Sequence, residues 1–102
     1  MQQYKIPGTS FILEYKIKKD NAIIYGVSKQ CKKLVVPDII NNIPVTEIAN
    51  RAFEKHPSLI NVSISSSVRK IGEFAFSDCL KIKEINILGE VEEIKFATFS
   101  NC

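Results

Sequence analysis

The sequence has few of the features that mark enzymes, metal sites or membrane spans. Its 102 residues include no Trp, one His and one Met, and no apolar run approaches the ~18 residues of a membrane-spanning helix. The first residues lack a charged stretch followed by an apolar core, so no signal peptide is predicted there. A Gly-rich phosphate loop, a Ser-His-Asp ordering and a metal-ligand cluster are also missing. We therefore expect no membrane insertion, no cofactor, no metal and no catalytic activity.

Cysteine is scarce as well, and its three copies are Cys31, Cys79 and Cys102. An odd number of cysteines without C-x-x-C spacing argues against both a disulfide framework and a zinc site. His56, the single histidine, is followed by Pro57. This context favours a packing or turn role for His56 over the role of a base beside a cysteine nucleophile.

Charge is distributed unevenly along the chain. There are 14 Lys and Arg against 11 Asp and Glu, but residues 1–33 hold seven lysines, two acidic residues and no Arg. Nucleic-acid binding needs Arg, aromatic and Gly residues interleaved on one face, a pattern that this segment lacks. We therefore expect no nucleic-acid partner and interpret these lysines as a solvated face, with a basic ligand patch as the alternative. The composition, 45% hydrophobic and 25% charged, is that of one ordinary globular domain.

The most informative feature is a repeat with a period of 23 residues. Three segments that begin at Val45, Val68 and Val91 align without a gap. Ile, Phe and a His or Cys recur at fixed offsets on the C-terminal side of each of these valines. The aligned sets are Ile48, Ile71 and Ile94; Phe53, Phe76 and Phe99; and His56, Cys79 and Cys102. Gapless agreement at so many positions indicates a repeat architecture, and the period lies in the range of leucine-rich repeats.

Each repeat contains a short strand and a return path. The patterns L-x-x-V-x-I at 59–64 and I-x-x-I-x-I at 82–87 end in alternation, which predicts a strand with one buried face. The Ala-Phe pair of the return path is expected on a turn of helix or 3₁₀ structure, with the repeat phenylalanines stacked inward. One unit cannot bury its apolar side alone, so the units should stack. The predicted fold class is α/β or mainly β: a leucine-rich-repeat solenoid of about three 23-residue coils.

The repeat resembles the BspA-type leucine-rich repeats of bacterial and protist surface proteins. The matching pattern is V-x-x-I-G-x-x-A-F-x-x-C-x-x-I-x-x-I-x-I over residues 68–87. Residues 34–45, L-V-V-P-D-I-I-N-N-I-P-V, are similar to the segment that precedes the first repeats in that family. The resemblance covers about residues 34–102. It implies a surface or secreted protein that contacts other proteins.

The N-terminal third is predicted to form a β-hairpin. Residues 11–18 alternate between an apolar and a mainly polar face, a turn signal follows at 19–21, and residues 22–27 supply the return strand. A solenoid needs a cap over the apolar side of its first coil. We therefore assign residues 1–33 as an N-terminal β-hairpin cap and residues 34–102 as the repeats, the last of them incomplete. The lysines of the cap would also discourage edge-to-edge strand pairing.

The candidate binding site is the exposed side of the repeat strands. The concave sheet of a solenoid is an extended surface that commonly binds partners. Side chains between the buried positions should point outward, because successive side chains of a strand alternate between its faces. The predicted protein-binding residues are Ile60, Asn61, Ser63 and Ser65 in one repeat, and Lys83, Glu84 and Asn86 in the next.

These features favour a non-enzymatic protein-binding module. By resemblance, it would act in adhesion or protein–protein recognition at the cell surface or outside the cell, through the exposed strand face. The alternative is a structural or assembly unit, either a cap with the first coils of a longer array or a fragment that self-associates. After Cys102 the period demands a further strand, so the strand at 82–87 would present an open edge for self-association.

Overall fold

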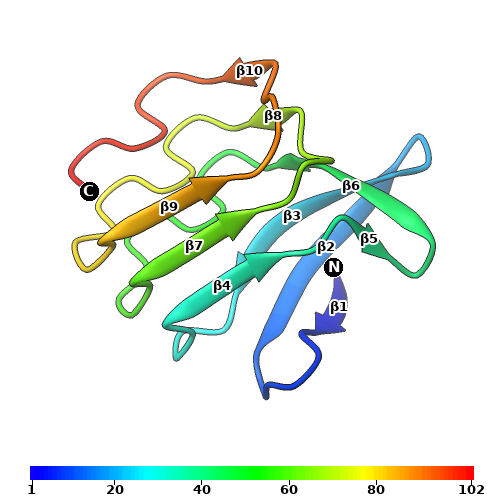
Figure 1. Cartoon of the computed structure of the whole chain (residues 1–102), viewed down its shortest axis with the longest axis horizontal. Helices are drawn as coiled ribbons and strands as arrows, with labels where there is room; N and C mark the ends of the chain where they lie inside the picture. The colour runs from blue at the N-terminus through cyan, green and yellow to red at the C-terminus, as the bar shows by residue number, and fades with distance from the viewer.

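The chain winds into coils whose strands build two sheets (Figure 1). The computed structural model describes residues 1–102. It is built from strands and turns, and no helix in it is long and apolar enough to cross a bilayer. The strands are β1 (Gln2–Lys5), β2 (Ile12–Lys18), β3 (Asn21–Val27), β4 (Lys33–Val36), β5 (Ile39–Ile40), β6 (Ile43–Ile48), β7 (Asn61–Ile64), β8 (Lys70–Ile71), β9 (Glu84–Ile87) and β10 (Glu93–Ile94).

The smaller sheet consists of three parallel strands in the order β4-β7-β9. Its register aligns Leu34, Val62 and Ile85. The alternation of the sequence predicts that these side chains are buried. Leu34 and Val62 are fully buried, and Ile85 of the last coil is half-buried. The strands predicted from the repeat pattern are therefore confirmed, and a third strand lies at residues 33–36.

The larger sheet has the order β1-β2-β3-β6-β8-β10, with β5 attached to β6. Its coil strands β6, β8 and β10 are parallel and align Ile48, Ile71 and Ile94, the isoleucines of the repeat. Strand β3 of the N-terminal hairpin pairs with β6 in parallel, so the hairpin continues this sheet. The sequence pattern predicted a return path here and not a second sheet, because β8 and β10 are only two residues long and show no alternation.

The expected helical or 3₁₀ turn on the return path does not form. Arg51 and Lys55 have positive φ angles of 60° and 58°, and the equivalent residues of the later coils share this left-handed conformation. A left-handed residue every few positions cannot belong to a right-handed helix. The amides of the return path instead bond to the next coil: the N–H of Phe53 donates to the Ala75 carbonyl at 2.8 Å. The return path is therefore a series of turns with hydrogen bonds between coils.

The repeat phenylalanines form a stack inside the solenoid, as predicted. The ring centroids of Phe53 and Phe76 are 5.0 Å apart with an interplanar angle of 24°. Those of Phe76 and Phe99 are 5.6 Å apart at 13°. Since each ring packs on its equivalent one coil away, the stack fixes the spacing of the coils.

The predicted N-terminal hairpin is confirmed as β2 and β3, which pair antiparallel. Lys19 and Asp20 connect them with φ angles of 51° and 63°. Positive φ at both central residues defines the type I′ turn that suits a two-residue hairpin. Leu13 and Tyr15 are buried on one face of β2, whereas Ile17 near the turn is exposed.

The first coil is longer than the others. Leu34 and Val62 are aligned although they are 28 positions apart, whereas Val62 and Ile85 are 23 apart. The additional residues form the hairpin of β5 and β6, whose turn residues Asn41 and Asn42 have φ angles of 50° and 67°. This insertion follows β4 and does not disturb the register of the smaller sheet.

Candidate binding face

Two rows of side chains cross the outer side of the smaller sheet, and we call them the strand face. Each row takes one residue from β4, one from β7 and one from β9, because the three strands pair in register. The rows are Lys33, Asn61 and Glu84, and Val35, Ser63 and Asn86. All of these residues are exposed except Ser63, which is half-buried. The structure thus brings four of the seven predicted binding residues together on one surface.

Ile60 and Lys83 lie beside this face, one residue before β7 and β9. The N–H of Lys83 donates to the Ile60 carbonyl at 2.8 Å, and the N–H of Ile60 donates to the Lys32 carbonyl at 2.8 Å. Lys32, Ile60 and Lys83 therefore lie side by side at the start of the strands. Lys32 and Lys83 are exposed, and Ile60 is half-buried.

The structure contradicts the predicted outward position of Ser65. Its side chain is buried, with 6% of the residue exposed. The hydroxyl donates to the Pro37 carbonyl at 3.1 Å and lies 2.9 Å from the hydroxyl of Ser67. Strand β7 ends at Ile64, so the alternation that predicted an outward side chain no longer applies at the next residue. Ser65 connects two coils and is not part of the strand face.

The strand face offers charged and amide groups that the fold itself uses little. The amide Nδ2 of Asn86 donates to the Glu84 carboxylate at 3.1 Å on the exposed surface. All ion pairs of the chain lie elsewhere. They join Arg51 to Glu54, Arg69 to Glu92, Lys70 to Glu47 and Lys95 to Glu93. The Lys33 ammonium and the Glu84 carboxylate therefore remain available for a partner.

His56 has the packing role that its position predicted. The imidazole is buried, with Nε2 2.9 Å from the Ser28 carbonyl oxygen. Nδ1 accepts hydrogen bonds from the N–H groups of Ser58 at 3.1 Å and Leu59 at 3.2 Å. These contacts require the neutral ring with its proton on Nε2. Burial, partly offset by the bond to Ser28, lowers the pKa of His56 below its usual 6.5.

Cys79, which takes the repeat position of His56 one coil later, also has a packing role. The Cys79 thiol is fully buried and donates to the Phe53 carbonyl at 2.9 Å. Burial raises the pKa of Cys79 to about 11, so the reactive thiolate is rare at neutral pH. No three His, Cys, Asp or Glu side chains converge where they could hold a metal ion. His56 and Cys79 are thus engaged in packing, whereas Cys102, at the same repeat position of the last coil, is exposed.

Coils of 23 residues, a parallel sheet on one side and an internal stack of phenylalanines define a leucine-rich-repeat solenoid. Residues 10–102 match the family described as BspA type leucine rich repeat region (6 copies). The chain belongs to this BspA-type leucine-rich repeat family. No significant match was found among curated proteins.

Solved structures of bacterial leucine-rich repeat proteins share the fold. The T. pallidum protein is 35% identical, with a TM-score of 0.83 over 88% of this chain and 43% of that one. The Bacteroides ovatus protein is 30% identical, with a TM-score of 0.77 over 88% of this chain and 26% of that one. A cell surface protein of Faecalibacterium prausnitzii is 20% identical, with a TM-score of 0.72 over 100% of this chain and 35% of that one, which shows the fold alone. The chain spans less than half the length of each of these proteins.

Proposed function

We propose that the chain is a non-enzymatic protein-binding module that recognises its partner through the strand face. The observation that carries this proposal is the register of β4, β7 and β9, which holds two straight rows of outward side chains on a rigid sheet. Solenoids present such sheets as binding surfaces. The ammonium of Lys33, the carboxylate of Glu84 and the amides of Asn61 and Asn86 can all bond to a partner's polar groups.

The strand face is small for a protein partner. Three strands about 4.8 Å apart make a surface roughly 10 Å wide, whereas a standard interface covers about 800 Å² of each partner. The partner must therefore also contact surfaces beside the sheet. The nearest are the segments that lead into its strands, which contain Lys32, Ile60 and Lys83.

The module acts at the cell surface or outside the cell in this proposal, in adhesion or protein recognition. One structural relative is named a cell surface protein. The BspA-type repeats resemble those of surface proteins in bacteria and protists. Fractionation of the source cells, followed by immunodetection of the chain, tests this location. Recovery of the chain in the cytosolic fraction alone would contradict it.

Selection from a phage-displayed random peptide library tests the strand face as a binding surface. Peptides enriched on the native chain should lose most of their binding to the triple variant Asn61→Ala, Glu84→Ala and Asn86→Ala. The matched control removes two amides and one carboxylate from exposed positions of β1 and β2, through Gln2→Ala, Gln3→Ala and Glu14→Ala. Equal retention of the peptides by both triple variants would refute the proposal.

Exposure at the last coil favours a second function, assembly. Ile94 is 50% exposed although the equivalent Ile48 and Ile71 are fully buried. Unpaired strand edges beside apolar side chains favour pairing with another chain. Sedimentation equilibrium should show an average mass that rises with concentration, and Ile94→Lys should restore the monomer. A monomer at every concentration would exclude this function.

We also propose that residues 1–33 cap the first coil. Tyr4, Ile6 and Phe11 pack against the core, and Tyr4 and Ile6 border the same hollow as Val35 of β4. Phe11→Asp should therefore accelerate amide hydrogen exchange in β4 more than in β9. Unchanged exchange in β4 would contradict a capping role.

A further inference from the structure

The edge of the smaller sheet at which its strands begin is rich in lysine. We call this edge the lysine rim. Its lysines lie on the segments that enter β4, β7 and β9 or at the first residue of β4, on the side of the molecule where these three arrows start (Figure 1). They are Lys29, Lys32, Lys33, Lys55, Lys81 and Lys83, all exposed. None of them takes part in the ion pairs of the chain.

Backbone hydrogen bonds fix the relative positions of two of these lysines, Lys32 and Lys83. Because Lys32, Ile60 and Lys83 bond in sequence, the two lysines stand two strand spacings apart, about 10 Å. Lys33 follows directly at the start of β4. An extended segment of a partner can therefore contact several ammonium groups at once.

The acidic residues of the rim offset the lysines only in part. Glu54 pairs with Arg51 at 2.6 Å. Glu84 and Asp78 each accept a hydrogen bond from a neutral asparagine amide and keep their charge, so two carboxylates outside ion pairs stand beside the six lysines. The segments that leave the strands contain Asp38, Glu90 and Glu92 against one cation, Arg69, which lies 4.0 Å from Glu92. Of the two edges, the one at which the strands begin thus carries the excess of positive charge.

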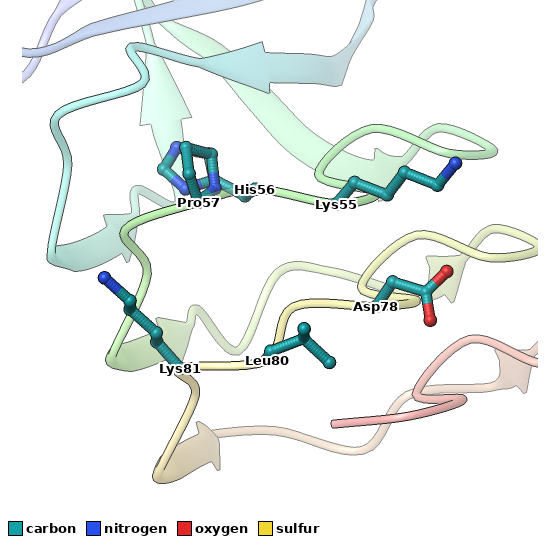
Figure 2. Close-up of a pocket in the computed structure, with 6 residues that line it drawn as sticks. All are labelled: Lys55, His56, Pro57, Asp78, Leu80 and Lys81. Atoms are coloured by element: carbon teal, nitrogen blue, oxygen red, sulfur yellow. The ribbon is translucent and has the colours of Figure 1, made fainter.

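An apolar hollow interrupts the rim. Figure 2 shows Leu80 between Lys81 on one side and Lys55 with Asp78 on the other, below His56 and Pro57 of the preceding coil. The hollow has a volume of about 380 Å³. Leu80 is 78% exposed and lines this hollow. An apolar side chain of a partner would cover it.

We infer that the lysine rim binds an acidic segment of a partner protein that also carries an apolar side chain. The acidic side chains lie along Lys32, Lys81 and Lys83, and the apolar one packs on Leu80. The inference rests on the proposed function, because it takes the partner to be a protein. It adds the chemistry of the partner and extends the narrow strand face over its lysine-rich edge.

The composition of the rim favours a peptide over a nucleic acid or an anionic polysaccharide. It contains no Arg for bidentate phosphate contacts and no Phe, Tyr or Trp on which bases stack. A polysaccharide would neutralise the lysines but leave Leu80 uncovered. An acidic peptide with one apolar residue satisfies both features.

The probe is a fluorescein-labelled peptide of glutamates with one central leucine. The full chain is titrated into this peptide, and fluorescence anisotropy reports the binding. Exposed ion pairs contribute little singly, so Lys32→Gln, Lys81→Gln and Lys83→Gln together should weaken binding roughly tenfold. The matched control, Lys5→Gln, Lys18→Gln and Lys19→Gln, removes the same charge from β1 and the hairpin turn and should have less than about a twofold effect. Binding should also weaken as salt rises from about 0.1 M to 1 M and shortens the screening length.

Three comparisons decide the outcome. Leu80→Ser should weaken the leucine peptide and leave an all-glutamate peptide unchanged. Equal losses in the two lysine triples would overturn the inference, because net charge alone would then explain binding. So would tighter binding of heparin or an oligothymidylate than of the peptide. The strand-face variant Asn61→Ala, Glu84→Ala and Asn86→Ala keeps every lysine. It therefore tests binding of the library peptides at the strand face separately from binding of the acidic peptide at the lysine rim.

Discussion

The imidazole Nε2 of His56 lies 2.9 Å from the carbonyl oxygen of Ser28, and this contact joins the segment after β3 to the segment between β6 and β7. The opposite nitrogen, Nδ1, accepts two backbone N–H groups. A protonated ring carries a hydrogen on Nδ1 and can no longer accept there. The two bonds that Nδ1 accepts from Ser58 and Leu59 therefore depend on a neutral His56, whereas the Nε2 bond to Ser28 can form in either protonation state.

The stability of the chain should consequently decrease in mild acid. Burial holds the pKa of folded His56 below 6.5, so the unfolded chain takes up a proton that the folded chain does not. The free energy of unfolding should fall as the pH is lowered through 6.5 and until the folded pKa is reached. The slope from this one group is at most about 1.4 kcal/mol per pH unit. Urea unfolding at a series of pH values measures it.

His56→Gln is the control for this prediction. Glutamine retains a donor and an acceptor but does not titrate, so the fall near pH 6 should be weaker in the variant. An identical pH dependence in both proteins would show that other groups cause it.

Phe76→Ala should be among the most destabilising single substitutions. Phe76 is fully buried and stacks on a ring at each side, Phe53 and Phe99. Removing a buried phenylalanine side chain costs about 3–5 kcal/mol. Phe99→Ala should cost less, because Phe99 is half-buried and has one stacking partner. Urea unfolding of both variants tests this order, and equal losses would contradict it.

Gly72→Ala should destabilise the contact between coils. A Cβ on Gly72 would lie 2.5 Å from the backbone nitrogen of Asn50 and 2.6 Å from the carbonyl carbon of Ala49. Backbone atoms cannot move aside, so the coils must shift, at a cost of about 1–3 kcal/mol. Gly26→Ala is the control, since its Cβ would meet nothing nearer than 3.5 Å. A thermal melt that ranks the two variants in the reverse order would contradict the coil spacing.

The three thiols should differ in reactivity. Cys31 and Cys79 are buried, whereas Cys102 is exposed. Burial raises the pKa of Cys79 to about 11, which leaves little thiolate at pH 8. Maleimide labelling followed by mass spectrometry should modify Cys102 first and the other two only after unfolding. Labelling of Cys79 as fast as Cys102 in the folded chain would contradict this packing.

The repeat made much of the fold predictable. The 23-residue offset located β7 and β9, and it placed the stack of Phe53, Phe76 and Phe99. It did not reveal the turns of the return path. Their left-handed residues include Arg51 and Lys55, which carry no sequence signal for positive φ, since glycine and asparagine are the residues that usually mark it.

The binding face was predictable where the strand alternation holds. Asn61 and Asn86 lie on it as predicted, but Ser65 does not, because the chain has left the strand at that point. Lys33 and Val35 were missed because the first coil is 28 positions long and falls out of the 23-residue period. Only the three-dimensional register reveals that β4 completes the rows.

A nuclear magnetic resonance titration tests the central claim, that the chain binds a protein partner at the strand face and its lysine rim. The ¹⁵N-labelled chain is titrated with the acidic leucine peptide, and amide shifts are mapped on the sequence. The account predicts shifts in residues 80–86, in β7 and near Lys32, with the hairpin turn at Lys19 and Asp20 unchanged. Shifts confined to the hairpin or to β6, β8 and β10 would contradict it.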